Sequence, residues 1–455
     1  MYFCNHLFLP WRMGREASDT CLKRRNKTDR YDKIQPMKKS NTTIRIALAT
    51  TAMLLFCCCG GSINTNHDPR FDEAGYLLND SIQPFRPEPP AAIKFYVEVS
   101  GSMNGFFRPN KPTQFKTDVW NVLSYYKSLN PTVYTLTNDG IHGKPMTSSQ
   151  FQTHMNTGAF VSTASTKVPE MIKTIIKSLN ADSGEVAVLI SDMKYSPVGE
   201  AAKEVRMAQY STDISNIIEE SDMATCLICT TSDYLDKKGN EIEQRSPYYY
   251  YIIGKGEQVV ETRNTISALL DRTGHFVDNI ENGIDYGKPT YSFGIPRKCE
   301  QLDDQPTFLY YEDADRDDTC TIRLKICLDN YRWLLHDEDN LAQAFDIETV
   351  YGSEVTVGAI TINKNETSGK NPTQETTATI ELKLSHMALD SEVLSWAINI
   401  PHKDHSRMKA FLEDAEKEEE VSKSYSVLEF INGMFLYEPS HKQTEKNYIL
   451  ISRKG

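Results

Sequence analysis

Apolar residues in the first half of the chain follow two alternating patterns. Some runs are continuous or alternate over strand length, and others recur at the spacing of an amphipathic helix. The strand-like runs cover residues 93–99, 131–137, 186–191, 224–229 and 248–253, and the helix-like runs cover residues 115–129, 168–179, 201–218 and 257–270. This alternation over residues 91–275 predicts an α/β domain with a doubly wound parallel sheet and helices on both of its faces.

The pattern changes after about residue 275. Strand-length runs now dominate and are separated by polar segments. They cover residues 319–328, 354–362, 376–384, 394–400 and 447–452, with helix-like stretches at residues 408–423 and 426–436. We therefore expect a β-rich C-terminal domain with helical segments over residues 276–455, and a sandwich is one architecture that this pattern allows.

An apolar segment near the N-terminus has the features of an export signal. Residues 44–56 are largely apolar, contain Arg45, follow Lys38 and Lys39, and precede three cysteines and two glycines. The run is too short to cross the hydrocarbon core of a bilayer, about 30 Å, as a helix. Its basic, apolar and small-residue order predicts a secretory signal within residues 1–57, with the residues before Met37 as an upstream extension.

The cysteines after this run resemble the lipidation site of bacterial lipoproteins. Such signals have a Leu three positions before the modified Cys and a small residue directly before it. Cys58 fits best, with Leu55 and Cys57 in those places, and Cys57 and Cys59 are the alternatives. The resemblance implies a lipid anchor in a cell envelope, such as an outer membrane, with periplasmic and surface display both open. An uncleaved anchor is the other interpretation.

The stretch after the cysteines is polar and then rich in proline, as in Pro84, Pro87, Pro89 and Pro90. This composition predicts a tether over residues 58–90 that lifts a folded domain from the membrane. The whole chain has a formal net charge of −12, and because the residues before the cysteines are basic, the remainder is more acidic still. We therefore expect neither nucleic acid nor an anionic lipid surface as a partner; divalent cations and basic partners suit this charge.

Five cysteines follow the anchor cluster, an odd number and too few for a disulfide scaffold in a chain of this size. They are Cys226, Cys229, Cys299, Cys320 and Cys327. The first two have the CxxC spacing of metal and redox sites but stand in an apolar run with strand character. On a strand they would point to opposite faces, which favours two small buried residues over a shared site.

The first predicted strand ends in side chains that carry oxygen. Glu98, Ser100 and Ser102 alternate in the sequence Phe-Tyr-Val-Glu-Val-Ser-Gly-Ser-Met-Asn-Gly. Side chains two positions apart on an extended segment point the same way. Hard cations such as Mg²⁺ take oxygen ligands, and open α/β sheets bind ligands at the carboxyl ends of their strands. These residues are therefore a candidate metal site.

This segment resembles the metal-ion-dependent adhesion site of the von Willebrand factor A domain, written Asp-x-Ser-x-Ser at the end of the first strand. The family adds a Thr from a later loop and an Asp that ends the central strand. Asp192 follows the apolar run at 186–191, and Thr166, with Thr163 as the alternative, precedes the helix-like run at 168–179. The resemblance covers about residues 91–275. It implies Mg²⁺ or another divalent cation at Glu98, Ser100, Ser102, Thr166 and Asp192, with an open coordination position for a partner's carboxylate.

One departure from the family is Glu98, which replaces the first Asp and is longer by one methylene. Its carboxylate could orient a metal-bound water, bind the ion directly, or fill the site and make a cation unnecessary. The chain contains no Gly-x-Ser-x-Gly or His-Glu-x-x-His motif and no evident Cys/His pair, so we do not expect an enzyme. The sequence favours a lipid-anchored envelope protein whose α/β domain binds a protein or other macromolecule. The alternatives are a structural subunit of an envelope complex with a vestigial metal site, and a metal-dependent hydrolase.

Overall fold

The computed structural model describes residues 70–78, 85–137, 140–158, 160, 167–195, 203–311, 319–335, 338–363, 378–401, 406–412, 420–436 and 441–454. These segments belong to one unit that begins at Gly61. The predicted signal, the lipidation candidates Cys57, Cys58 and Cys59, and the predicted ligand Thr166 with its alternative Thr163 lie outside the described residues. No helix among the described residues is long and apolar enough to cross a lipid bilayer.

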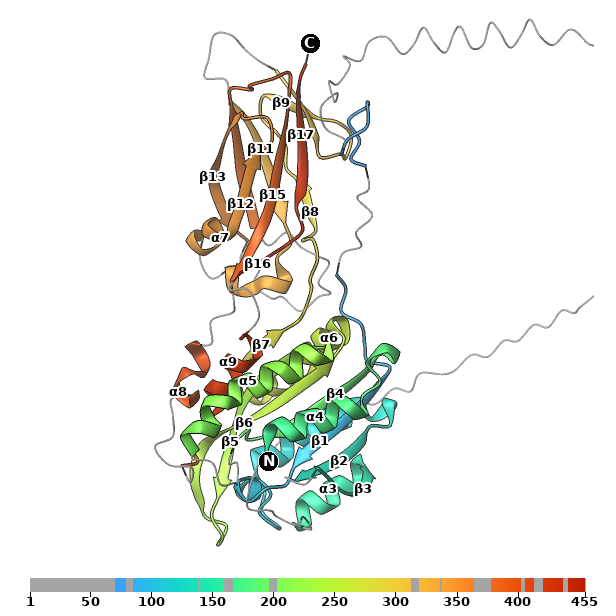
Figure 1. The fold of residues 1–455 in the computed structure, drawn as a ribbon, viewed down its shortest axis with the longest axis vertical. Coiled ribbons are helices and arrows are strands. Elements are labelled where there is room, and N and C mark those ends of the chain that lie inside the picture. Colours follow the sequence, from blue (N-terminus) through green and yellow to red (C-terminus); the bar gives the residue numbers. More distant parts are fainter. Residues whose placement is uncertain are drawn as a thin grey trace, which may run out of the picture. The chain divides into compact units, whose positions relative to one another are not determined.

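A seven-stranded sheet forms the centre of the first half of the chain (Figure 1). Its spatial order is β3 (Gly140–Thr147), β2 (Thr132–Thr137), β1 (Ala92–Glu98), β4 (Glu185–Ser191), β6 (Glu241–Gly254), β5 (Ala224–Leu235) and β7 (Phe276–Asn282). β1 runs parallel to β2 and β4, whereas β3, β6, β5 and β7 each pair antiparallel with their neighbours. The protein is therefore mixed α/β with a mixed sheet, and the prediction of a parallel sheet is wrong.

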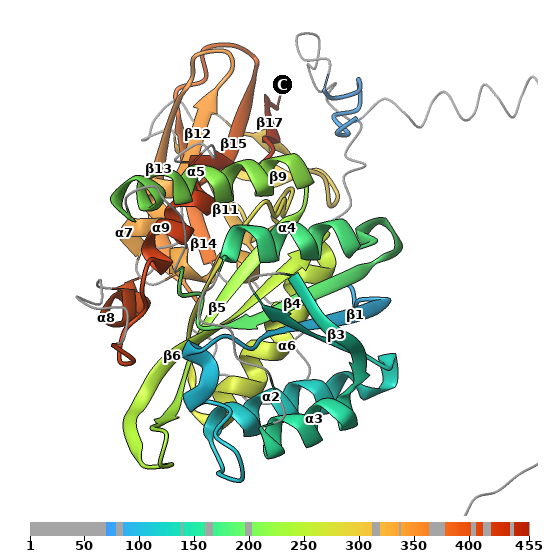
Figure 2. The ribbon, with the colours of Figure 1, turned by 60° about the horizontal axis from the view of Figure 1, so that its bottom comes forward.

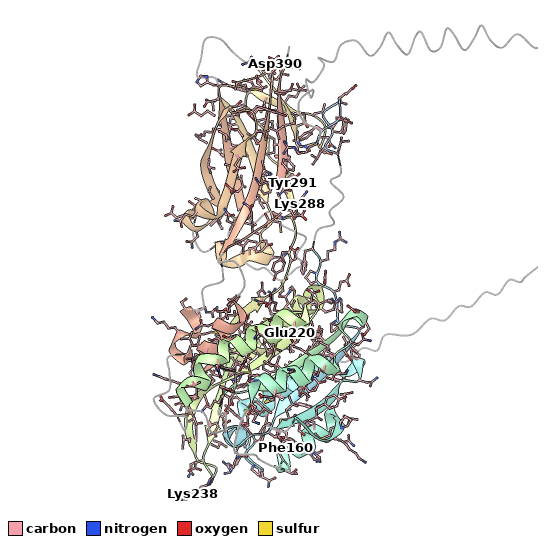
Figure 3. The ribbon with its side chains drawn as sticks, in the orientation of Figure 1. Phe160, Glu220, Lys238, Lys288, Tyr291 and Asp390 are labelled. Carbon is pink, nitrogen blue, oxygen red and sulfur yellow. The ribbon has the colours of Figure 1, made fainter. Side chains whose placement is uncertain are left out.

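A long hairpin produces the longest antiparallel pairing of this sheet, between β5 and β6. β5 continues well past its predicted end at Cys229, and the chain turns directly into β6. In the turn, Asp236 accepts hydrogen bonds from the backbone amides of Lys238 and Asn240, and Gly239 has a left-handed φ of +84°. Figure 3 shows Lys238 at the hairpin tip. Strands joined by a tight turn must pair antiparallel, whereas a crossover helix keeps two strands parallel.

Helices cover both faces of this sheet, as Figure 2 shows. One face carries α2 (Gln114–Tyr125), continued by η2 (Tyr126–Leu129), with α3 (Ser148–Thr157) and α6 (Gly256–Thr273), and the other carries α4 (Val168–Ser178) and α5 (Lys203–Ser221). Each face has its own hydrophobic cluster because alternate strand residues point to opposite sides. Cys226 lies in one cluster and Cys229 in the other, both fully buried, which confirms the prediction for this pair.

Two further sheets follow the first one along the chain, as the strand-length runs predicted. One has the order β12 (Phe345–Thr349), β15 (Ser391–Pro401), β17 (Asn447–Arg453), β10 (Thr307–Tyr310) and β9 (Cys299–Gln301), with β16 (His441–Gln443) on β15. The other has the order β13 (Glu354–Ile362), β14 (Ala378–Ser385), β11 (Thr319–Ile326) and β8 (Tyr291–Phe293). Tyr291, labelled in Figure 3, packs on Trp396 with ring centroids 5.4 Å apart. The inner faces of the two sheets therefore share one core. The short helices η4 (Asp329–Leu335) and α7 (Glu338–Ala344) lie between β11 and β12 in the chain.

Part of the predicted tether packs against the β-rich sheets. Phe71 is buried and clusters with Val393 of β15 and Leu450 of β17. The Tyr76 hydroxyl donates to Asp303 at 2.8 Å, and the Thr307 hydroxyl donates to the carbonyl of Gly75 at 2.5 Å. Residues 70–78 are thus a docked segment of the folded unit.

A late segment of the chain packs on the first sheet. It comprises η5 (Ser406–Met408), α8 (Lys409–Leu412) and α9 (Val427–Met434), whose apolar side chains join the cluster beneath α4 and α5. The predicted helix at 408–423 differs from the structure, because residues 420–426 are not helical. Their polar groups bond to sheet residues instead of forming a helical ladder, as in the 2.5 Å hydrogen bond from Ser246 to the Val421 carbonyl.

Candidate functional site

The residues that resemble an adhesion site lie where β1 and β4 end. These strands are parallel neighbours, with Val97 opposite Ile190, so their carboxyl ends share one edge of the sheet. Glu98 is the last residue of β1, and its carboxylate accepts a hydrogen bond from the hydroxyl of Ser191, the last residue of β4. Asp192 follows directly, so Glu98 and Asp192 come from adjacent strand ends.

The two serines of the motif stand side by side. After β1 the chain turns through Gly101 into η1 (Ser102–Gly105), and the hydroxyl oxygens of Ser100 and Ser102 are 2.9 Å apart. Two neighbouring ligands in an octahedral Mg²⁺ site, each about 2.1 Å from the ion, are about 3 Å apart. The two hydroxyls therefore have the separation that such a pair of ligands requires, although the same distance also suits their hydrogen bond.

A tight turn after β4 fixes Asp192. Its carboxylate accepts from the amide of Lys194 at 3.2 Å, while the Ser191 hydroxyl accepts from the amide of Met193 at 2.7 Å. Met193 has a φ of +55°, a left-handed conformation that is uncommon for a residue other than glycine. Such strain persists where surrounding structure determines it. Here it accompanies the turn that holds Asp192, which is only 3% exposed and directly follows Ser191, the hydrogen-bond partner of the 1% exposed Glu98.

Tyr234 contacts the serine motif from the part of β5 that extends beyond the predicted strand. Its hydroxyl donates to the carbonyl of Ser102 at 2.8 Å, and its ring packs edge-on against Phe106 with centroids 5.0 Å apart. Burial raises the pKa of Tyr234, and the nearby negative charge of Asp192 raises it further. Tyr234 therefore stays neutral near neutral pH and keeps donating its hydrogen bond to Ser102. This bond connects β5 to the segment that carries the two serines.

Gly105 permits this contact. A Cβ added there would lie 2.3 Å from the Tyr234 ring, which cannot swing away without losing its bond to Ser102. We expect Gly105→Ala to lower the free energy of unfolding by about 1–3 kcal/mol, as overpacked substitutions do. Urea denaturation measures this, with Gly256→Ala as the matched control, because the nearest atom to an added Cβ at Gly256 is 3.7 Å away. Equal losses in both variants would contradict the assigned role of Gly105.

The late segment borders the same edge of the sheet. The Lys194 ammonium donates to the Glu420 carbonyl at 2.8 Å, and the Tyr195 amide donates to the Ser426 hydroxyl at 3.2 Å. Tyr249 and Ser424 share a further hydrogen bond between hydroxyls, and Tyr249 lies opposite Ser191 in the pairing of β6 with β4. Residues 420–426 therefore anchor the turn that carries Asp192.

A second polar cluster ties α2 to the end of α6. The buried Asp118 carboxylate contacts His275 Nδ1 at 2.6 Å and accepts from the Thr273 hydroxyl at 3.1 Å. Burial raises the pKa of Asp118, and the contact with His275 lowers it in part. The cluster links α2 to the C-terminal end of α6 on the face opposite α4 and α5, so a structural role accounts for these hydrogen bonds.

Glu98, Ser100, Ser102 and Asp192 thus gather at one edge, whereas Thr166 lies outside the described residues. Sequence reasoning missed Ser191, although it ends the apolar strand directly before Asp192, and Tyr234, which only the extended hairpin delivers. Within the described ranges, no three His, Cys, Asp or Glu side chains are placed to hold a metal, so a cation here would depend on the serine hydroxyls. No family model, curated protein or solved structure matches the chain.

Proposed function

We propose that this protein is a lipid-anchored component of a bacterial cell envelope, and that its α/β domain, similar to a von Willebrand factor A domain, binds another macromolecule through a divalent cation. The observation that carries the proposal is the pair of hydroxyls of Ser100 and Ser102, 2.9 Å apart, at the edge of the sheet where the parallel strands that lead to Glu98 and Asp192 end. Hydroxyl and carboxylate oxygens form the ligand set that Mg²⁺ prefers.

Electrostatics supports a cation at this edge. Glu98 and Asp192 are both almost fully buried, and buried carboxylates are costly unless charge or hydrogen bonds offset them. A divalent cation between the serines and carboxylates would offset both charges. It would also let an acidic protein, with a net charge of −12, accept a carboxylate from its partner at the remaining coordination position.

Calorimetric titration of Mg²⁺ and Mn²⁺ into the chain from Gly61 onward tests this proposal. We expect wild-type binding that Asp192→Ala abolishes and that Ser100→Ala weakens at least about tenfold, since each removes an oxygen ligand. Asp182→Ala is the matched control, because it removes the same charge from a carboxylate that is 90% exposed in its ion pair with Lys255. Wild-type binding that persists in Asp192→Ala would refute the site.

One observation favours a second candidate, a structural subunit in which the metal site is vestigial. The longer Glu98 side chain already accepts a hydrogen bond from Ser191 across the strand ends, a contact that can replace an ion. Glu98→Asp separates the two proposals, because it restores the family's first residue. If only this variant binds Mg²⁺, and a chelator leaves capture of the partner by the wild type unchanged, the structural subunit is the better description.

A further inference from the structure

Two cysteines of the β-rich sheets are in unusually close contact. The sulfur atoms of Cys299 and Cys320 lie 2.8 Å apart. Even carbon atoms that are not bonded to each other pack at about 3.5–4.0 Å, and sulfur is larger than carbon. Cys299 begins β9, an edge strand of one sheet, and Cys320 lies on β11 of the other. We infer that Cys299 and Cys320 form a disulfide that joins the two sheets.

The backbone brings the two cysteines together. Arg297 and Thr321 exchange both backbone hydrogen bonds, at 3.0 and 3.1 Å, so they form a closely spaced antiparallel pair next to the two cysteines. Residues paired in this way have Cα atoms about 5.5 Å apart. Because Cys320 directly precedes Thr321 and Cys299 lies two residues after Arg297, this pairing brings the two cysteines close to each other. Lys298 then takes a left-handed φ of +58°, which turns the chain between Arg297 and Cys299 and directs Cys299 to Cys320.

The remaining described cysteines are placed elsewhere. Cys226 and Cys229 are buried on opposite faces of the seven-stranded sheet, in the clusters that its helices cover. Cys327 follows the end of β11, after Ile326 has paired with Tyr291 on β8. The odd number of cysteines, which argued against a disulfide scaffold, is therefore consistent with a single bridge.

The order of the steps that form the disulfide follows from the different solvent exposure of the two cysteines. Cys299 is partly exposed, whereas Cys320 is buried, and its hydrogen bond to Cys299 together with burial raises its pKa. The Cys299 thiolate attacks an external disulfide and releases one thiolate of the oxidant. Cys320 then loses its proton, and its sulfur attacks Cys299 and releases the second thiolate. Two protein thiols and one external disulfide thus become one protein disulfide and two small thiols.

Inside a cell, this bond depends on the export that belongs to the proposed function, because disulfides persist in oxidising compartments. It would close the loop between β9 and β11 and hold an edge strand of one sheet to the other. By restricting the unfolded chain, such a crosslink stabilises the folded one.

Peptide mapping of the purified full-length chain tests the inference. After incubation with glutathione disulfide, we expect proteolysis to release a peptide pair linked through Cys299 and Cys320, with both residues resistant to alkylation. We also expect a reducing agent to lower the Tm by about 5 °C or more. Cys327→Ser should keep the linked peptides and the Tm difference, whereas Cys299→Ser should lose both.

Alkylated or glutathionylated Cys299 and Cys320 after this oxidation would overturn the inference, and this readout on the wild type requires no variant to fold. The same test separates the two proposals, because oxidation in vitro requires no export. A bridge that forms in vitro but is absent from protein isolated from cells would count against the envelope location and leave the cysteine pairing intact.

Discussion

Replacing Glu392 by alanine is expected to lower the free energy of unfolding by about 4 kcal/mol, because the change leaves several backbone donors without an acceptor. Glu392 is fully buried at the start of β15. Its carboxylate accepts four backbone N–H groups at 2.7 to 3.0 Å, those of Val350, Tyr351, Ser353 and Val393. These bonds organise the turn between β12 and β13, so the loss should appear in urea denaturation of the whole unit.

The isosteric variant Glu392→Gln sharpens this test. A glutamine keeps one acceptor oxygen but places its NH₂ group against amide donors, so we expect a loss of about 2 kcal/mol. Glu354→Gln is the control, because Glu354 is an exposed residue of β13, and surface changes of this kind stay within about 0.5 kcal/mol. If Glu392→Ala fails to fold, the glutamine variant still gives a measurable difference. Stability equal to wild type in both Glu392 variants would show that the turn is held by other contacts.

Glu392 also illustrates what sequence periodicity can and cannot reveal. The apolar run at 394–400 correctly predicted a strand, because its large apolar residues alternate with small or polar ones at a period of two. The same pattern gives no sign that a preceding glutamate is buried, since three of its four amide partners come from a turn about forty positions away, as in the bond with Ser353. Because every residue except proline has a backbone N–H group, the amino-acid types of the donors do not reveal such long-range hydrogen bonds.

The central elements of the first sheet were predictable from the pattern of apolar residues. β1 and β4 are buried over most or all of their length, and α4 has a strongly apolar face that packs on the sheet, so their patterns are continuous and strong. β3 escaped detection because it contains Gly140, Gly143 and a proline and lies at an edge of the sheet. α3 had a readable signal that was missed, the capping box formed by Thr147 and Gln150.

The direction of the strands was not available from the order of the elements. The order strand, helix, strand predicts a parallel pair only if the two strands lie next to each other in the sheet. Here the chain places β6 between β4 and β5, so α5 connects strands that are not adjacent. The strand ends that carry Glu98 and Asp192 are unaffected, because β1 and β4 remain parallel neighbours. The shared edge of β1 and β4, which carries the candidate site, was therefore predictable, whereas the order and direction of the other strands were not.

The placement of the late segment gives the second prediction with a large effect. Phe430 of α9 is fully buried and packs edge-on against Tyr251 of β6, with ring centroids 5.1 Å apart. Replacing it by alanine removes a large side chain from the cluster beneath α4 and α5, and we expect a loss of about 3–5 kcal/mol in the free energy of unfolding. Leu436→Ala is the control on the same segment, because Leu436 is 47% exposed and its removal should change stability little.

The strands that lose protection from hydrogen exchange are more informative than the size of the stability loss. Since Phe430 packs on β6, hydrogen exchange in Phe430→Ala should accelerate first at the amides of β6 and β4, although the mutated residue follows the β-rich strands in sequence. Residues 420–426 continue into α9 and bond to Lys194 and Tyr195, so the turn that holds Asp192 should lose protection with them. Faster exchange confined to β15 and β17 would instead place the segment with the β-rich sheets and separate it from the candidate site.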